Sequence, residues 1–274
     1  MKIVFMGTPD FAKFSLEAIY NAGHEIIAVV TNPDRPKGRG MKMIASPVKE
    51  FAIEKNIPVY QPIKIRNNIE FIEHIKSLNP EVICVVAYGK ILPKEILDIP
   101  PKGCINVHGS LLPKYRGAAP IQWAVLNGDK KTGITTMYMD EGMDTGDMIL
   151  KQEENYTMAP MLSKEMAKID WKNQTARDIK NLVRGLNPIM GAYAYLNGKK
   201  IKFWKVDIAN NIGMENPDFL KNGTVLISDK KDGIFIKTKE GILKVLEIQG
   251  ENAKKMNIQD FLRGNDIPEF SLFE

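Results

Sequence analysis

Short apolar runs that alternate with helical patterns fill the first half of the chain and restrict its fold more than any other feature. The run KIVFM at residues 2–6 is followed by a helical stretch that ends at Ala22-Gly23, and then by EIIAVVT at residues 25–31. Such a strand–helix–strand opening requires a parallel sheet with a right-handed crossover. The unbroken run VICVVA at residues 82–87 is typical of a strand buried on both faces. The pattern predicts an α/β fold with an open, mostly parallel, Rossmann-like sheet.

Polar residues follow the expected strands at the edge where open α/β sheets bind their ligands. Tyr88-Gly89 comes after one strand, and the run GCINVHGSLLPKYRG at residues 103–117 contains the next. Because alternate side chains of a strand share a face, Asn106 and His108 are expected to point the same way. We therefore expect one shared cleft at this edge. Taken alone, His108 could equally well be a structural residue at a strand end that hydrogen-bonds to a backbone carbonyl.

An acidic, glycine-rich turn, DEGMDTGD at residues 140–147, offers a carboxylate for this cleft, and a strand through Leu150 is expected after it. Asp144 beside His108 would fix the imidazole tautomer and make the ring more basic, and Asn106 could donate to a developing oxyanion. This trio suits acyl or formyl transfer to an amine, since one nitrogen must lose a proton and another must gain one. Without a G-x-S-x-G turn or a reactive cysteine, direct transfer is favoured over a covalent acyl-enzyme. A turn-forming role is the alternative for Asp144.

The second half of the chain has a different pattern. An amphipathic helix is expected over Thr175 to Leu186, and five short strand-like runs follow it. Asn197-Gly198 and Asp232-Gly233 are typical of hairpin turns between such strands. Five short strands favour a small barrel, because closure hides the sheet edges. We predict two domains, residues 1–154 with the Rossmann-like sheet and residues 155–274 with a linker, a helix and the barrel.

Basic side chains are concentrated in two segments, although the net charge of +5 is mild. Residues 31–43 and residues 198–205 each contain four of them, and the second segment interleaves its lysines with Phe203 and Trp204. Such patches suit an unpaired nucleic acid or a tRNA end, whereas solvated loops and lysine-guarded strand edges are the alternative. The candidate RNA contacts are Arg35, Lys37, Arg39 and Lys200.

Composition argues against several other classes. The apolar runs are too short to span a membrane, and two cysteines in buried-type runs fit a reducing compartment. We therefore expect a monomeric cytoplasmic protein that does not bind membranes. The first turn, GTPDF, lacks the dinucleotide-binding glycines, which disfavours a dehydrogenase. The cysteines lack the spacing of a zinc site, and we expect no metal.

Three segments together resemble the folate-dependent formyltransferases. They are GTPDF near the start, the run N-x-H-G-SLLPKYRG, and the later Gly133…Asp144-x-Gly146. The resemblance covers the whole chain, and TNPDRPKGRG, SPVK and NLVRGLNP…GAYAY are most similar to the members that act on a tRNA. It implies formyl transfer from 10-formyltetrahydrofolate to the α-amino group of methionine on initiator methionyl-tRNA.

The resemblance also implies roles for individual residues. Asn106, His108 and Asp144 would be catalytic, and the basic loop would reach the tRNA acceptor end. The small barrel would correspond to the OB-like C-terminal domain of the family, which contacts the tRNA. Two rival functions remain open. One is formyl transfer to a small amine, such as a nucleotide-linked amino sugar or glycinamide ribonucleotide, and the other is non-catalytic RNA binding. The residues expected to line the folate site are Tyr88, Ser110, Leu111, Leu112 and Pro113.

The sequence departs from the family pattern after Leu150. Family members usually carry a helix-bearing segment before the Tyr-x-x-Ala-Pro run, whereas here LKQEE runs almost directly into NYTMAPML. The catalytic trio lies upstream of this departure. We expect strained or broken geometry over residues 151–157.

Overall fold

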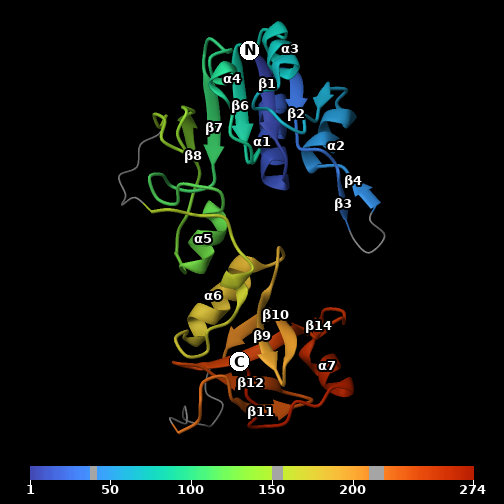
Figure 1. Cartoon of the computed structure of the whole chain (residues 1–274), viewed down its shortest axis with the longest axis vertical. Helices are drawn as coiled ribbons and strands as arrows, with labels where there is room; N and C mark the ends of the chain where they lie inside the picture. The colour runs from blue at the N-terminus through green and yellow to red at the C-terminus, as the bar shows by residue number, and fades with distance from the viewer. Residues whose placement is uncertain (38–41, 150–156, 210–218) are drawn as a thin grey trace. The chain divides into compact units, whose positions relative to one another are not determined.

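The computed structural model describes residues 1–37, 42–149, 157–209 and 219–274. Figure 1 shows the order of the elements along the chain. The chain divides into two compact units, one with residues 1–120 and 133–160 and the other with residues 121–132 and 161–274. The domain boundary at residue 154 stays a prediction. The connection expected to be strained, up to residue 156, lies outside the described residues.

The first unit is built on a six-stranded sheet in the order β5-β2-β1-β6-β7-β8. All neighbouring pairs are parallel except β7 and β8, which are antiparallel. The predicted open, mostly parallel sheet is therefore confirmed. Its strands are β1 (Lys2–Gly7), β2 (Glu25–Val30), β5 (Val59–Tyr60), β6 (Val82–Val86), β7 (Cys104–His108) and β8 (Thr135–Tyr138).

Both faces of this sheet are covered, which explains the unbroken apolar strands. In β1, Phe5 belongs to a buried cluster with side chains of α1 and α2. Its neighbours Val4 and Met6 belong to a second cluster with side chains of α3 and α4. The alternation along β1 thus places the two cores on opposite faces of the sheet. The helices are α1 (Asp10–Asn21), α2 (Pro47–Glu54), α3 (Ile69–Ser77) and α4 (Lys94–Leu97).

Two parts of the first unit differ from the sequence prediction. The basic loop is a hairpin, in which β3 (Arg35–Lys37) pairs with β4 (Lys42–Ile44), while its tip lies outside the described residues. These strands lack apolar alternation, so the sequence pattern does not reveal them. The strand expected through Leu150 is reduced, over its described part, to an isolated bridge between Met148 and Met137, flanked by backbone hydrogen bonds from Tyr138 to Asp147 and from Ile149 to Thr136. Ile149 is 46% exposed, so this run does not bury a strand face.

The second unit contains a five-stranded antiparallel sheet in the order β11-β12-β13-β10-β9, with β14 paired to β13. The predicted helix is confirmed, and Thr175 caps it through a capping box with Asp178. The five predicted strands are also present. The elements are α5 (Pro120–Leu126), η1 (Glu165–Ala167), α6 (Ala176–Leu186), α7 (Ile258–Gly264), β9 (Ala192–Leu196), β10 (Lys199–Ile208), β11 (Val225–Asp229), β12 (Gly233–Lys237), β13 (Ile242–Gln249) and β14 (Met256–Asn257).

The C-terminal residues bond to both edge strands of this sheet. Val225 in β11 donates its backbone N–H to the carbonyl of Ser271, at 2.8 Å. Tyr195 in β9 and Glu274 exchange two backbone hydrogen bonds of 2.7 and 2.8 Å. Both edges are therefore covered, as an OB-like barrel requires. None of the helices in the described part of the chain is long and apolar enough to cross a membrane.

Candidate active site

The three polar side chains singled out in the sequence meet at the end of β7. Asn106 Nδ2 donates to Asp144 Oδ1 at 3.2 Å, and His108 Nδ1 lies 3.6 Å from Asp144 Oδ2. Asn106 and His108 share a face of β7, while Asp144 arrives from the turn after β8. The side chain of His108 is 5% exposed and that of Asp144 is 12% exposed. At this burial, electrostatic interactions between the groups are stronger than in water.

The second imidazole nitrogen of His108 contacts the backbone. Nε2 lies 2.8 Å from the carbonyl oxygen of Tyr115. A carbonyl can only accept a hydrogen bond, so Nε2 carries the hydrogen. The nitrogen that can gain or lose a proton is therefore Nδ1, beside Asp144. From the sequence, a carbonyl contact and a carboxylate partner are alternative interpretations of His108. In the structure His108 has both contacts.

Backbone groups hold Asp144 and Tyr115 in place around the imidazole. Gly117 donates its N–H to Asp144 Oδ2 at 2.8 Å. Asp144 has a φ of 53° and Tyr115 a φ of 61°, so both are non-glycine residues in the left-handed region. Each such residue costs about 1–3 kcal/mol, which the surrounding contacts must offset. Both partners of His108 are thus held by specific local geometry.

Two threonines that sequence reasoning missed anchor the loop after β7. Thr135 Oγ1 donates to the carbonyl of Ser110 at 2.7 Å and accepts from the N–H of Leu112 at 2.9 Å. Thr157 Oγ1 accepts from the N–H of Tyr115 at 2.8 Å. Because the Tyr115 carbonyl contacts the His108 imidazole, Thr157 positions His108 through Tyr115, and Thr135 fixes the part of the loop that precedes Tyr115. In the sequence they look like ordinary β-branched residues.

Replacing Thr135 with valine is expected to destabilise the protein by about 2 kcal/mol, because the isosteric side chain leaves two buried backbone groups unpaired. Thr135 is 4% exposed, so water cannot substitute for the hydroxyl. Urea unfolding measures the change. Thr136→Val is the matched control, because the Thr136 side chain is partly exposed and makes no hydrogen bond among the described residues. Equal losses in the two variants would contradict the anchoring role.

The residues expected to line the folate site differ in exposure. Ser110 and Leu112 are buried, whereas Leu111 and Pro113 are partly exposed and can contact a ligand through their side chains. Tyr88 is 1% exposed and belongs to the core beneath α3 and α4. Burial raises the pKa of its phenol, and its hydroxyl has no hydrogen-bond partner among the described residues. The Tyr88 side chain therefore contributes to the core, and its binding role stays a prediction.

The candidate RNA contacts lie in both units. Arg35 is exposed on β3, the side chain of Lys37 is not among those described, and Arg39 lies outside the described residues. In the second unit, Lys200 Nζ is 3.5 Å from the centroid of the Tyr193 ring. On the neighbouring part of the same sheet, the ammonium groups of Lys202 and Lys255 are each 5.6 Å from the Trp204 ring. The aromatic rings of β9 and β10 thus have lysine ammonium groups over them, two from β10 and one from the residue before β14.

The cysteines are poorly suited to nucleophilic catalysis. Burial raises the pKa of Cys84 to about 11 and that of Cys104 to about 12. Thiols with these values stay protonated near neutral pH and are weak nucleophiles. The structure therefore disfavours a covalent intermediate on either thiol. Among the described residues, no three His, Cys, Asp or Glu side chains are arranged to hold a metal ion.

Comparison with known proteins identifies two family models. One, described as "Formyl transferase", matches residues 1–175, and the other, "Formyl transferase, C-terminal domain", matches residues 161–266. The chain is 46% identical to the methionyl-tRNA formyltransferase of Caldanaerobacter subterraneus subsp. tengcongensis, over 100% of both chains. It is 48% identical to the protein of that name from Clostridioides difficile, over 97% of this chain and 98% of the other.

The length of one alignment bears on the connection after Leu150. The alignment with the Caldanaerobacter protein extends over 317 positions, which is 43 more than the 274 residues of this chain. In the alignment, 43 residues of the relative therefore have no counterpart in this chain. A gap of this size is large enough for the helix-bearing segment that we expect to be missing.

Two solved structures show the same fold. WlaRD, a sugar 3N-formyl transferase crystallised with dTDP and 5-N-formyl-THF, has a TM-score of 0.58 at 18% identity and covers 93% of this chain and 99% of its own. HypX from Aquifex aeolicus, in complex with tetrahydrofolic acid, has a TM-score of 0.56 at 14% identity. The match covers 100% of this chain and 51% of HypX. At these identities the likeness concerns the fold alone.

Proposed function

The chain belongs to the formyl transferase family, and on that premise we propose that it formylates the α-amino group of methionine on initiator methionyl-tRNA. The formyl donor is 10-formyltetrahydrofolate. The observation that carries the proposal is the meeting of Asn106, His108 and Asp144 at the end of β7. Full-length similarity to two methionyl-tRNA formyltransferases supports the tRNA substrate.

Proton transfer is the task of the His108–Asp144 pair. The reaction forms a bond between the amine nitrogen and the formyl carbon, and it breaks the bond from that carbon to the folate nitrogen. The amine loses one proton and the folate nitrogen gains one. His108 Nδ1 is the site of this exchange, because the Nε2 hydrogen is bound to the Tyr115 carbonyl. Asp144, 3.6 Å from Nδ1, stabilises the charged imidazolium.

Asn106 stabilises the charge that develops on the formyl oxygen. One N–H of its amide is bound to Asp144, and the second N–H makes no hydrogen bond among the described residues. An amide has two donors, so the second N–H can bind an oxyanion. With imidazolium charge beside it, this donor set fits a substrate that presents a formyl group. Leu111 and Pro113 supply apolar contacts for the folate, with Tyr88, Ser110 and Leu112 supporting the wall.

The remaining assignments concern the tRNA contacts, the domain boundaries, the cellular location and the oligomeric state. Arg35, Lys37 and Arg39 contact the tRNA acceptor end, and Lys200 binds the tRNA from the barrel. The cations over the rings of β9 and β10 support this role, since phosphate binding needs such cations. Residues 1–154 form the catalytic domain and residues 155–274 the RNA-binding part. The enzyme acts as a cytoplasmic monomer.

One assay tests the function directly. Labelled formyl transfer from 10-formyltetrahydrofolate is measured with methionine-charged initiator tRNA, and a charged elongator tRNA serves as the control. Product is expected with the initiator tRNA and little with the elongator. Formylation of an amino-sugar nucleotide or of glycinamide ribonucleotide without tRNA would replace the proposal with small-amine transfer. RNA binding with no formylated product would instead indicate a non-catalytic RNA-binding protein.

A further inference from the structure

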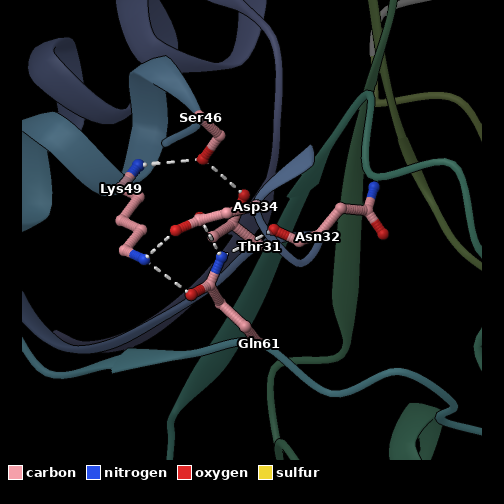
Figure 2. A network of polar contacts seen from close by, with 6 residues as sticks. All are labelled: Thr31, Asn32, Asp34, Ser46, Lys49 and Gln61. Atoms are coloured by element: carbon pink, nitrogen blue, oxygen red, sulfur yellow. Dashed lines mark hydrogen bonds and ion pairs between the residues drawn. The ribbon is translucent and has the colours of Figure 1, made fainter. Parts of the chain in front are cut away.

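A polar network joins six residues around the base of the β3–β4 hairpin, as Figure 2 shows. The residues come from the segment after β2, from the start of α2 and from the position after β5. They lie far apart in the sequence but converge on the two ends of the hairpin. This hairpin-base network consists of Thr31, Asn32, Asp34, Ser46, Lys49 and Gln61.

The first end of the hairpin is held at Asp34, directly before β3. Lys49 Nζ lies 2.6 Å from Asp34 Oδ2, and Gln61 Nε2 donates to Asp34 Oδ1 at 2.8 Å. Lys49 Nζ also donates to Gln61 Oε1 at 2.8 Å, so the three side chains bond to one another in a closed set. The Lys49 and Asp34 side chains are 21% and 26% exposed. Charge-assisted bonds that are this sheltered are stronger than those of exposed pairs.

The second end of the hairpin is held at Ser46, two residues after β4. Its hydroxyl lies 2.8 Å from the hydroxyl of Thr31, and it accepts the N–H of Lys49 at 3.1 Å as the N-cap of α2. Both ends of the hairpin are thus bound to elements of the main sheet and to α2. Two fixed ends determine the direction in which a short hairpin projects.

The network continues to the sheet edge that carries the catalytic trio. Gln61 Nε2 donates to the carbonyl of Asn32 at 2.8 Å. Asn32 Nδ2 in turn donates to Thr8 Oγ1 at 3.0 Å and to the carbonyl of Tyr88 at 2.9 Å. Thr8 and Tyr88 follow β1 and β6, whose carboxyl ends lie at the same edge as His108. A bonded chain therefore connects the hairpin base with the edge where the chemistry is proposed.

The charges of the network leave the hairpin basic. Asp34 is the one acidic residue in the segment 31–43. Hydrogen bonds from Lys49 and Gln61 hold the pKa of its carboxyl below the usual range. Lys49 of α2 neutralises this carboxylate, so Asp34 does not offset the positive charge of the basic residues in the segment. That charge can attract an anionic partner.

We propose that Asp34, Lys49 and Gln61 are positioning residues that aim the basic β3–β4 hairpin at the RNA substrate. They act through the hairpin and touch neither the formyl group nor the amine. The inference rests on the proposed function, since it takes a tRNA as the substrate. It predicts that loosening the network weakens productive tRNA use and leaves folate use unchanged.

Steady-state kinetics of Lys49→Met test this proposal. KM for charged initiator tRNA is expected to rise about tenfold, the loss of ~1.4 kcal/mol, while KM for 10-formyltetrahydrofolate and kcat stay within about twofold. Lys102→Met is the matched control. It removes the same charge from an ion pair of 2.8 Å with Glu81, and both residues precede their strands, at the opposite edge of the sheet.

A charge exchange provides the second variant. Asp34→Lys combined with Lys49→Asp restores the ion pair at unchanged net charge. Gln61 can reverse its amide to bond both exchanged groups, at the loss of its Nε2 bond to the Asn32 carbonyl. KM for tRNA is expected to return to within about threefold of wild type, which a simple loss of positive charge would not allow. Equal tRNA KM values for Lys49→Met and Lys102→Met would overturn the proposal. Parallel losses in tRNA and folate use would also overturn it. Failure of the wild-type protein to formylate tRNA would refute the proposed function instead.

Discussion

Replacing His108 with alanine is expected to lower kcat for formyl transfer by about 10³-fold, within the range for loss of a general acid–base. KM for both substrates is expected to stay within a few-fold of wild type. His108 Nδ1 is the nitrogen that can exchange a proton beside Asp144, and Nε2 is bound to Tyr115. No other imidazole can replace it, because the remaining histidines lie before β2 and within α3.

Single-turnover formylation with saturating substrates measures this effect, because it isolates the chemical step. His108 is buried, so urea unfolding must show that the alanine variant is folded at the assay temperature. His74→Ala is the matched control, since the His74 ring lies in the same unit, tilted against the Tyr60 ring with 4.5 Å between their centroids. Its kcat is expected to match wild type. A His108→Ala variant with near wild-type kcat would refute the proposed site.

The sheets of both units could be predicted because buried strands require apolar residues in a recognisable pattern. Strands covered on both faces must be apolar throughout, as β6 is, and short strands separated by Asn197-Gly198 and Asp232-Gly233 mark hairpins. The β3–β4 hairpin has no such apolar pattern in its sequence. Its base is bound by side chains such as Asp34 and Lys49, which are distant in sequence and follow no periodic pattern.

The meeting of Asn106 with His108 could be anticipated from strand alternation, and Asp144 from the acidic turn after β8. The groups that hold these side chains could not. The Tyr115 carbonyl and the Gly117 N–H are backbone groups, and every residue type except proline provides both. Only the path of the loop makes these two groups specific. Sequence therefore identifies the candidate catalytic side chains better than the backbone that orients them.

Replacing Asp144 with asparagine is expected to lower kcat by about 10³-fold with little change in stability. Asparagine keeps the size of the side chain, tolerates the φ of 53°, and can still accept from the Gly117 N–H. It removes the negative charge that faces His108 Nδ1 at 3.6 Å. It also replaces the oxygen that accepts from Asn106 with an NH2 group, to which the Asn106 amide can adapt by reversing. The substitution therefore separates the charge of Asp144 from its role in the turn.

Two further variants make this prediction decisive. Asp140→Asn changes a carboxylate in the same turn that accepts from Gly142 N and Thr145 Oγ1, and we expect kcat near wild type. Asp144→Ala removes the acceptor and places alanine at positive φ, so a loss of about 1–3 kcal/mol in unfolding free energy is expected as well. If Asp144→Asn keeps kcat while Asp144→Ala only unfolds more easily, Asp144 is a turn residue. A loss of kcat in Asp144→Asn, without a loss of stability, instead requires its negative charge beside the imidazole during formyl transfer.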